Sequence, residues 1–168
     1  EGWQQVGYVP SAVANYLSLL GWSPKDDSQV MPLSEIIERF GLPQINRANA
    51  RFDLEKLQWM NYEHLRGLPM ADYRERAVAA GVDFGGATED YIAAALGTCQ
   101  DKVKQVDDLP TFCSFYFTDE FDYDAAMAAK AFAPDNKEPF ARLREVFADV
   151  EDFTPEPLEA ALKALAEE

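Results

Sequence analysis

Side chains able to do covalent chemistry are few and widely spaced in this sequence. His64 is the only histidine, and no Ser, Cys or Asp is placed beside it to act as its partner. A general base needs a nucleophile or a substrate proton within hydrogen-bond reach. Cys99 and Cys113 stand 14 positions apart, which matches no metal-ligand spacing, and cysteine is among the most often buried residues. We therefore predict no catalytic residue and two core thiols in a reducing compartment.

Phosphate-binding and metal-binding patterns give no further site. The sequence has no glycine-rich phosphate loop and no zinc pattern. The acidic run at residues 119–124, DEFDYD, lacks the glycine at position 6 and the glutamate at position 12 of a calcium loop. We predict a solvated turn there, with no metal and no cofactor held by this chain.

One helix carries a pair of side chains suited to a sugar-phosphate backbone. Asp53 is placed to cap a helix running to about Asn61, in which Leu54, Leu57 and Met60 share an inward face. Lys56 and Trp59 are three positions apart on a neighbouring stripe that turns to solvent. A cation beside an exposed indole fits RNA, and it equally fits a lysine stem that covers an aromatic ring. The pair alone leaves both readings open.

The charge is unevenly distributed along the chain. The net charge is −15, yet residues 1–76 hold 8 Lys/Arg against 10 Asp/Glu, and residues 77–168 hold 7 against 20. Between Arg39 and Arg66 the balance reverses to 5 basic against 3 acidic residues. A polyanion should therefore meet this stretch and be repelled by most of the remainder. An ordinary solvated face would show the same counts.

The composition indicates a folded chain outside the membrane. Hydrophobic residues make up 48% of 168, enough to bury a core, and no apolar run approaches the roughly 20 residues that cross a bilayer. Neither a signal peptide nor an initiator Met opens the sequence, and it ends inside an expected helix. We expect a soluble, cytoplasmic piece of a longer protein.

Capping residues and apolar periodicity predict an all-α fold. The expected helices cover residues 12–20, 35–40, 53–61, 69–80, 88–109 with a break near Gly97, 125–132, 140–150 and 155–168. Ser34, Thr88 and Asp124 are the expected caps of the second, fifth and sixth helices, and Trp22 is expected to lie in the core. Pro110 is expected to stop the fifth helix, and residues 112–117 read as a buried aromatic segment. The charge shift and the turn at residues 84–86 predict two small helical units in series, dividing near residues 67–87.

Three segments resemble bacterial glutamyl-tRNA synthetases. Residues 7–23 (GYVPSAVANYLSLLGWS) are similar to the segment that follows the second catalytic signature of that family. Residues 52–61 (FDLEKLQWMN) are similar to its Phe-Asp-Leu-Glu-Lys-Leu-x-Trp-Met/Leu-Asn, and residues 117–119 (FTD) to its Phe-Thr-Asp/Glu turn. The order and the spacing of all three agree with the family.

This resemblance implies a position within a larger enzyme. Residues 1–66 would form the stem-contact region and residues 67–168 the first helical anticodon-binding domain. An upstream Rossmann-type domain, whose signatures do not occur in this sequence, would bind ATP, Mg²⁺ and glutamate. The implied function is to position tRNA(Glu) for aminoacylation, as part of a monomeric ligase whose catalytic site lies elsewhere. The related archaeal-type and glutaminyl enzymes carry β-barrels where this sequence predicts helices.

The resemblance also nominates tRNA-binding residues. Lys56, Trp59 and Asn61 match the motif and would face or support the tRNA. Charge adds Arg47, Arg51 and Arg66 to this set. Similar synthetases aim a basic residue at an anticodon base, and Lys102 occupies that place here, where lysine offers a point charge and not the bidentate contact of arginine.

The sequence also allows a function without RNA. The 13 excess negative charges of residues 77–168 would also suit an acidic helical module that binds proteins and has no RNA role.

Overall fold

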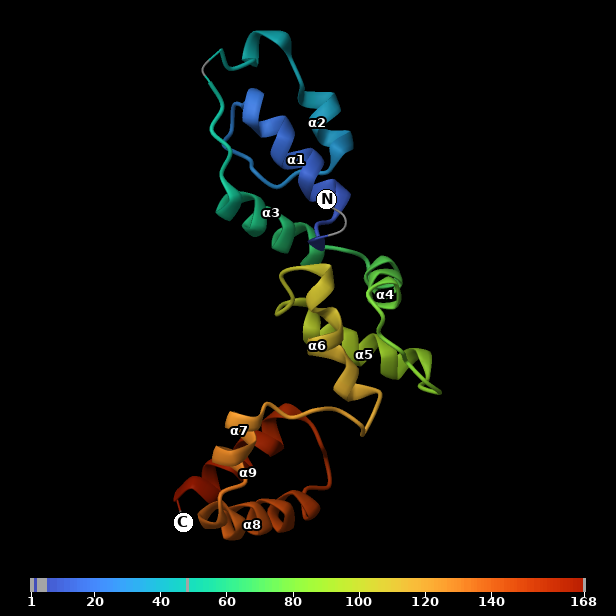
Figure 1. The fold of residues 1–168 in the computed structure, drawn as a ribbon, viewed down its shortest axis with the longest axis vertical. Helices are drawn as coiled ribbons and strands as arrows, with labels where there is room; N and C mark the ends of the chain where they lie inside the picture. Colours follow the sequence, from blue (N-terminus) through green and yellow to red (C-terminus); the bar gives the residue numbers. More distant parts are fainter. Residues whose placement is uncertain (1, 3–5, 48, 168) are drawn as a thin grey trace. The chain divides into compact units, whose positions relative to one another are not determined.

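Helices make up the regular structure of the described chain. The computed structural model describes residues 2, 6–47 and 49–167 (Figure 1). No strand occurs among these residues, and Trp22 and Ile45 form an isolated antiparallel bridge. The predicted all-α class is confirmed. Within the described ranges, no helix is long and apolar enough to cross a membrane.

The chain divides into two compact units, Glu1–Glu120 and Phe121–Glu168. The first unit contains α1 (Pro10–Gly21), α2 (Leu33–Arg39), η2 (Leu42–Gln44), α3 (Leu54–Arg66), α4 (Met70–Ala79), α5 (Glu89–Gln100), η3 (Val106–Asp108), α6 (Leu109–Cys113) and η4 (Ser114–Tyr116). The second contains α7 (Ala125–Ala131), η5 (Pro134–Asn136), α8 (Lys137–Ala148) and α9 (Pro155–Glu167).

Local sequence signals account for most helix starts. The side chains of Asp53, Thr88 and Asp124 each accept a backbone N–H three residues ahead, as N-caps do, at 3.0, 3.4 and 2.8 Å. These three predicted caps are confirmed. The cap predicted at Ser34 is wrong, because α2 already begins at Leu33 and Pro32 occupies the cap position.

The region after α5 differs from the prediction. The helix continues through Gly97 and ends at Gln100, so the predicted break and the predicted end at residue 109 are both wrong. Pro110 does not stop a helix. It lies in the first turn of α6, where the missing N–H costs nothing. The segment at residues 112–117 is only partly buried, since Cys113 is enclosed while Phe112 and Phe115 are exposed.

Three clusters form the core of the first unit. The largest joins Val9 and Ala12 of the N-terminal segment to Leu65 of α3, Tyr73 of α4 and Leu96 of α5, with further residues around them. The second is made by Tyr8, Tyr16, Leu57 and Met60, and the third by Trp22, Met31 and Ile36. The largest cluster therefore connects residues on both sides of the expected boundary near residue 67.

The inward face predicted for α3 is correct except at its first residue. Leu57 and Met60 are buried, as is Trp22, which was also predicted to lie in the core. Leu54 is 50% exposed, because it lies at the end of the helix, outside the turns that α1 covers. The predicted boundary between a stem-contact region (residues 1–66) and an anticodon-binding region (residues 67–168) concerns function and not compactness, and it stays a prediction.

Candidate nucleic-acid interface

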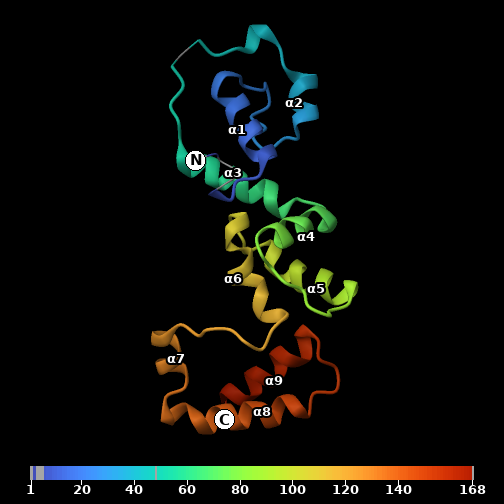
Figure 2. The same cartoon turned by 45° about the vertical axis from the view of Figure 1, so that its right-hand side comes forward.

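Helix α3 separates a buried face from an exposed one. Its buried residues are Leu57, Met60, Asn61 and Leu65. The opposite face carries Glu55, Gln58, Trp59, Tyr62 and Arg66, and Trp59 is 42% exposed. This helix packs on α1 (Figure 2). The exposed face is therefore held on a rigid support, which a binding surface requires.

Asn61 lies wholly inside the protein. Its Oδ1 accepts the backbone N–H of Val9 at 2.8 Å, and its Nδ2 donates to the carbonyl oxygen of Lys104 at 2.8 Å. The side chain is 0% exposed, so it cannot touch a ligand on the surface. Of the two roles predicted for Asn61, only support of the surrounding surface is compatible with this position.

Two of the predicted cations line one groove at the start of α3. This groove, of about 290 Å³, is bordered by Arg51 and Lys56, with Tyr16, Asn46 and Asn49 among its other walls. The Tyr16 hydroxyl accepts the backbone N–H of Asp53 at 2.6 Å, which fixes the beginning of the helix. Among the described residues, neither Arg51 nor Lys56 takes part in an ion pair. Their charges are available to an anion.

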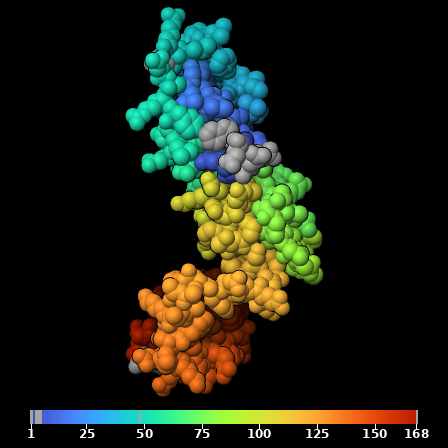
Figure 3. Space-filling view, in the orientation of Figure 1, coloured from blue at the N-terminus to red at the C-terminus, as the bar shows by residue number. Residues whose placement is uncertain are grey.

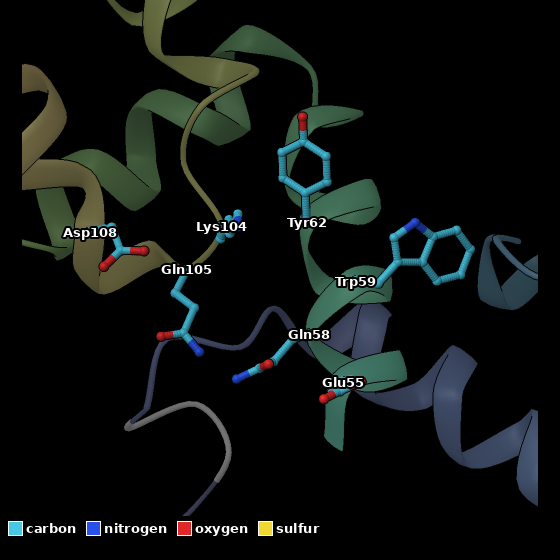
Figure 4. Close-up of a pocket in the computed structure, with 7 residues that line it drawn as sticks. All are labelled: Glu55, Gln58, Trp59, Tyr62, Lys104, Gln105 and Asp108. Atoms are coloured by element: carbon cyan, nitrogen blue, oxygen red, sulfur yellow. The ribbon is translucent and has the colours of Figure 1, made fainter. Parts of the chain in front are cut away.

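A second groove runs along the exposed face of α3. Its volume is about 540 Å³, and its walls are Glu55, Gln58, Trp59 and Tyr62 from the helix and Lys104, Gln105 and Asp108 from the segment after α5. Figure 4 shows the Gln58 and Gln105 side chains pointing toward each other from the two walls, with the Trp59 ring on the other side of the α3 ribbon in this view. Both walls belong to the first unit, where the two segments lie side by side (Figure 3).

The other cations of the basic stretch, and Lys102 after α5, differ in their availability to a ligand. Arg39 pairs with Asp26 and Glu35 and is neutralised. Arg66 pairs with Glu63 at 3.3 Å and lies over the Tyr62 ring at 5.5 Å. A hydrogen bond with Tyr62 and the nearby Glu63 raise the pKa of Arg66. Arg47 and Lys102 are exposed and line neither groove.

His64 is bound to the protein interior. Its Nε2 lies 2.9 Å from Oδ1 of Asn15, which also accepts the backbone N–H of Met31 at 2.9 Å. Burial lowers the pKa of His64, which favours the neutral ring. The His64 ring therefore connects α3 to α1 and to the segment before α2. Its role is to hold these elements together.

The two cysteines are free and buried, which confirms them as core residues. The Cys99 thiol donates to the carbonyl oxygen of Phe112 at 3.1 Å. Burial, together with a hydrogen bond to Cys99, raises the pKa of Cys113 to about 12, so its thiol is protonated and inert. In the part of the chain that the structure describes, no three His, Cys, Asp or Glu side chains gather into a metal-binding group.

Six residues of the second groove were not predicted as site residues from the sequence: Glu55, Gln58, Tyr62, Lys104, Gln105 and Asp108. Tyr62 follows Trp59 by three positions, and this spacing places both rings on one face, so a helical pattern could have found it. Lys104 and Gln105 carry no such signal, because only the packing of the segment after α5 brings them to α3.

Comparison with known proteins gives a consistent result. The family described as an anticodon binding domain matches residues 58–168. The glutamate–tRNA ligase of Phocaeicola vulgatus is 32% identical over 170 residues, covering 96% of this chain and 32% of that protein. The glutamate–tRNA ligase of Moorella thermoacetica is 31% identical over 176 residues, covering 99% of this chain and 36% of that protein.

Solved structures agree with these relatives. A crystal structure of a glutamate tRNA ligase from Elizabethkingia meningosepticum, in complex with its amino acid, superposes with a TM-score of 0.76 at 25% identity. The match covers 99% of this chain and 33% of that one. The chain thus spans about a third of the length of the relatives it matches.

Proposed function

The chain belongs to the anticodon binding domain family, and from this membership we propose that it is the tRNA-binding portion of a glutamate–tRNA ligase. Its function is to position tRNA(Glu) for aminoacylation. The chemical step belongs to a part of the ligase outside this chain, which binds ATP and Mg²⁺. The whole enzyme acts in the cytoplasm as a monomer, and residues 1–168 alone are inactive.

The observation that carries this proposal is the exposed surface at the start of α3. Arg51 and Lys56 line one groove without ion pairs among the described residues, and Trp59 stands one turn further along the same helix. Cations that contact phosphates fix the register of a nucleic acid, and an exposed indole offers a face to a ribose or a base. The surrounding protein is acidic, so this local surface is where a polyanion is attracted.

The remaining predicted contacts take secondary roles in this proposal. Arg47 is exposed and adds charge near the first groove, while Arg66 is partly neutralised by Glu63. Lys102 is exposed and lies two residues after the end of α5, and in this proposal it approaches an anticodon base as a point charge. In functional terms, residues 1–66 act as the stem-contact region and residues 67–168 as the first anticodon-binding region.

An acidic protein-binding module is the weaker candidate. It does not require Arg51 and Lys56 beside an exposed tryptophan, and the family match covers the acidic part of the chain.

Aminoacylation tests the proposal directly. We expect the full-length polypeptide to attach glutamate to tRNA(Glu) in the presence of ATP, and residues 1–168 to attach none. Trp59→Ala in the full-length enzyme should raise the KM for tRNA with little change in the KM for glutamate or ATP. A full-length enzyme that charges no tRNA with glutamate would refute the proposal.

A further inference from the structure

The second groove on α3 differs chemically from the first. The first groove offers two cations, Arg51 and Lys56, with a single carboxylate at Asp53. The second offers one cation, Lys104, against two carboxylates, Glu55 and Asp108. Its local charge is therefore negative, which opposes a phosphate. Its other polar walls are two amides, Gln58 and Gln105, which donate and accept hydrogen bonds.

We propose that this second groove binds an unstacked nucleobase of the tRNA, one that carries an amino group. The inference rests on the proposed function and assigns a base-binding role to Gln58 and Gln105. Single-stranded bases are recognised by stacking on aromatic rings and by hydrogen bonds to their edges. The groove supplies both, since Trp59 and Tyr62 provide ring faces and the two amides provide the hydrogen-bonding groups.

The groove should prefer a base with an amino group because its walls are rich in hydrogen-bond acceptors. Glu55 and Asp108 only accept hydrogen bonds at neutral pH, and each glutamine adds an amide oxygen. Adenine, cytosine and guanine carry an exocyclic NH₂ group with two N–H donors, whereas uracil has no amino group and offers only its single ring N–H. A volume of about 540 Å³ lies within the range of pockets that hold small organic ligands.

Hydrogen bonds between segments distant in the sequence hold the two walls of the groove in place. Asn61 bonds through its Nδ2 to the carbonyl oxygen of Lys104 at 2.8 Å. The Tyr62 hydroxyl donates to the carbonyl oxygen of Asp101 at 2.9 Å, and the Val106 N–H donates to the carbonyl oxygen of Gly7 at 3.0 Å. These bonds cross between segments more than 35 residues apart in sequence. The groove is therefore formed before any RNA binds, which lowers the entropic cost of binding.

Chemical probing of tRNA bound to the full-length ligase tests the inference. Dimethyl sulfate modifies unpaired adenine and cytosine, and kethoxal modifies unpaired guanine. The wild type is compared with Gln58→Ala and Gln105→Ala, which keep Cβ and break no contact described for these side chains. Gln29→Ala is the matched control, since Gln29 is exposed and lines neither groove.

We expect one base that the wild type protects to become reactive with either groove variant. The affinity of each groove variant for tRNA should be about tenfold lower than that of the wild type, in line with the loss of contacts to one base. The dependence of this affinity on salt concentration should not change. Gln29→Ala should protect the same base as the wild type.

Two results would overturn the inference while leaving the proposed function intact: unchanged protection and affinity in both groove variants, or a weaker salt dependence, which would indicate a phosphate in the groove. Failure of the wild type to bind tRNA would instead remove the proposed function and this inference together.

Discussion

The two compact units differ in how much of their side-chain surface they bury. The first unit encloses three apolar clusters and two fully buried asparagines, Asn15 and Asn61. The second unit, of 48 residues, has no buried residue in any described part of its helices, and Phe132, Phe140 and Phe153 are 59%, 47% and 65% exposed. A chain this short encloses little apolar surface, whatever its sequence.

The charges follow the same division. The second unit has 5 Lys/Arg against 12 Asp/Glu, whereas Arg51 and Lys56, which form no ion pair with any residue the structure describes, belong to the first unit. The first unit therefore combines a rigid support with a local attraction for anions. This contrast explains why we place the principal RNA contacts on α3.

The largest expected effect concerns the core of the first unit. Leu65→Ala removes a side chain that is 0% exposed and leaves a cavity among helices α1, α4 and α5. We expect a loss of about 2–5 kcal/mol in the free energy of unfolding. Phe140→Ala in the second unit, where the ring is 47% exposed, should cost clearly less. Urea denaturation of both variants measures the difference, and equal losses would contradict the contrast between the units.

A smaller effect is expected from the buried amide of α3. Asn61→Ala leaves the Val9 N–H and the Lys104 carbonyl without their partner. We expect a loss of about 1–3 kcal/mol, the usual cost of an unsatisfied buried polar group. Denaturation gives this value. A variant as stable as the wild type would show that Asn61 does not hold the segment after α5 against α3.

The smallest effect should appear in the pH dependence of stability. Burial lowers the pKa of His64 in the folded state, so the unfolded chain binds a proton more readily. The stability from this residue is complete above the unfolded pKa of roughly 6.5 and declines as pH falls from there toward the lowered pKa. The Tm measured between pH 7.5 and 5.5 should fall less steeply in His64→Gln, which keeps a donor for Asn15. Identical slopes would exclude His64 as the cause.

Local sequence signals predicted most of the fold. The caps at Asp53, Thr88 and Asp124 depend only on residues within one turn, and all three occur as expected. The errors arise where tertiary packing decides. Gly97 stays helical inside α5, and Pro110 starts a helix where a stop was expected. Leu54 fits the apolar pattern of α3 yet lies beyond the part of the helix that is covered.

The candidate site could be predicted only in part for the same reason. Periodicity placed Lys56 and Trp59 on the outer side of α3; Trp59 is exposed, whereas Lys56 is half-buried. No pattern in the sequence distinguishes a buried Asn61 from an exposed one. Lys104 and Gln105 reach α3 through contacts that span more than 40 residues, which a local pattern does not encode.

The most direct test of our central claim is a salt titration of tRNA binding by the full-length ligase, comparing the wild type with Lys56→Ala and Lys163→Ala. Lys163 is an exposed lysine of the acidic second unit, paired with Glu159 at 2.6 Å, and serves as the matched loss of one charge. We predict that Lys56→Ala weakens binding and reduces the slope of log affinity against log salt by about one phosphate contact, while Lys163→Ala changes neither. Equal slopes in the wild type and a folded Lys56→Ala variant would contradict the claim that α3 meets the RNA backbone.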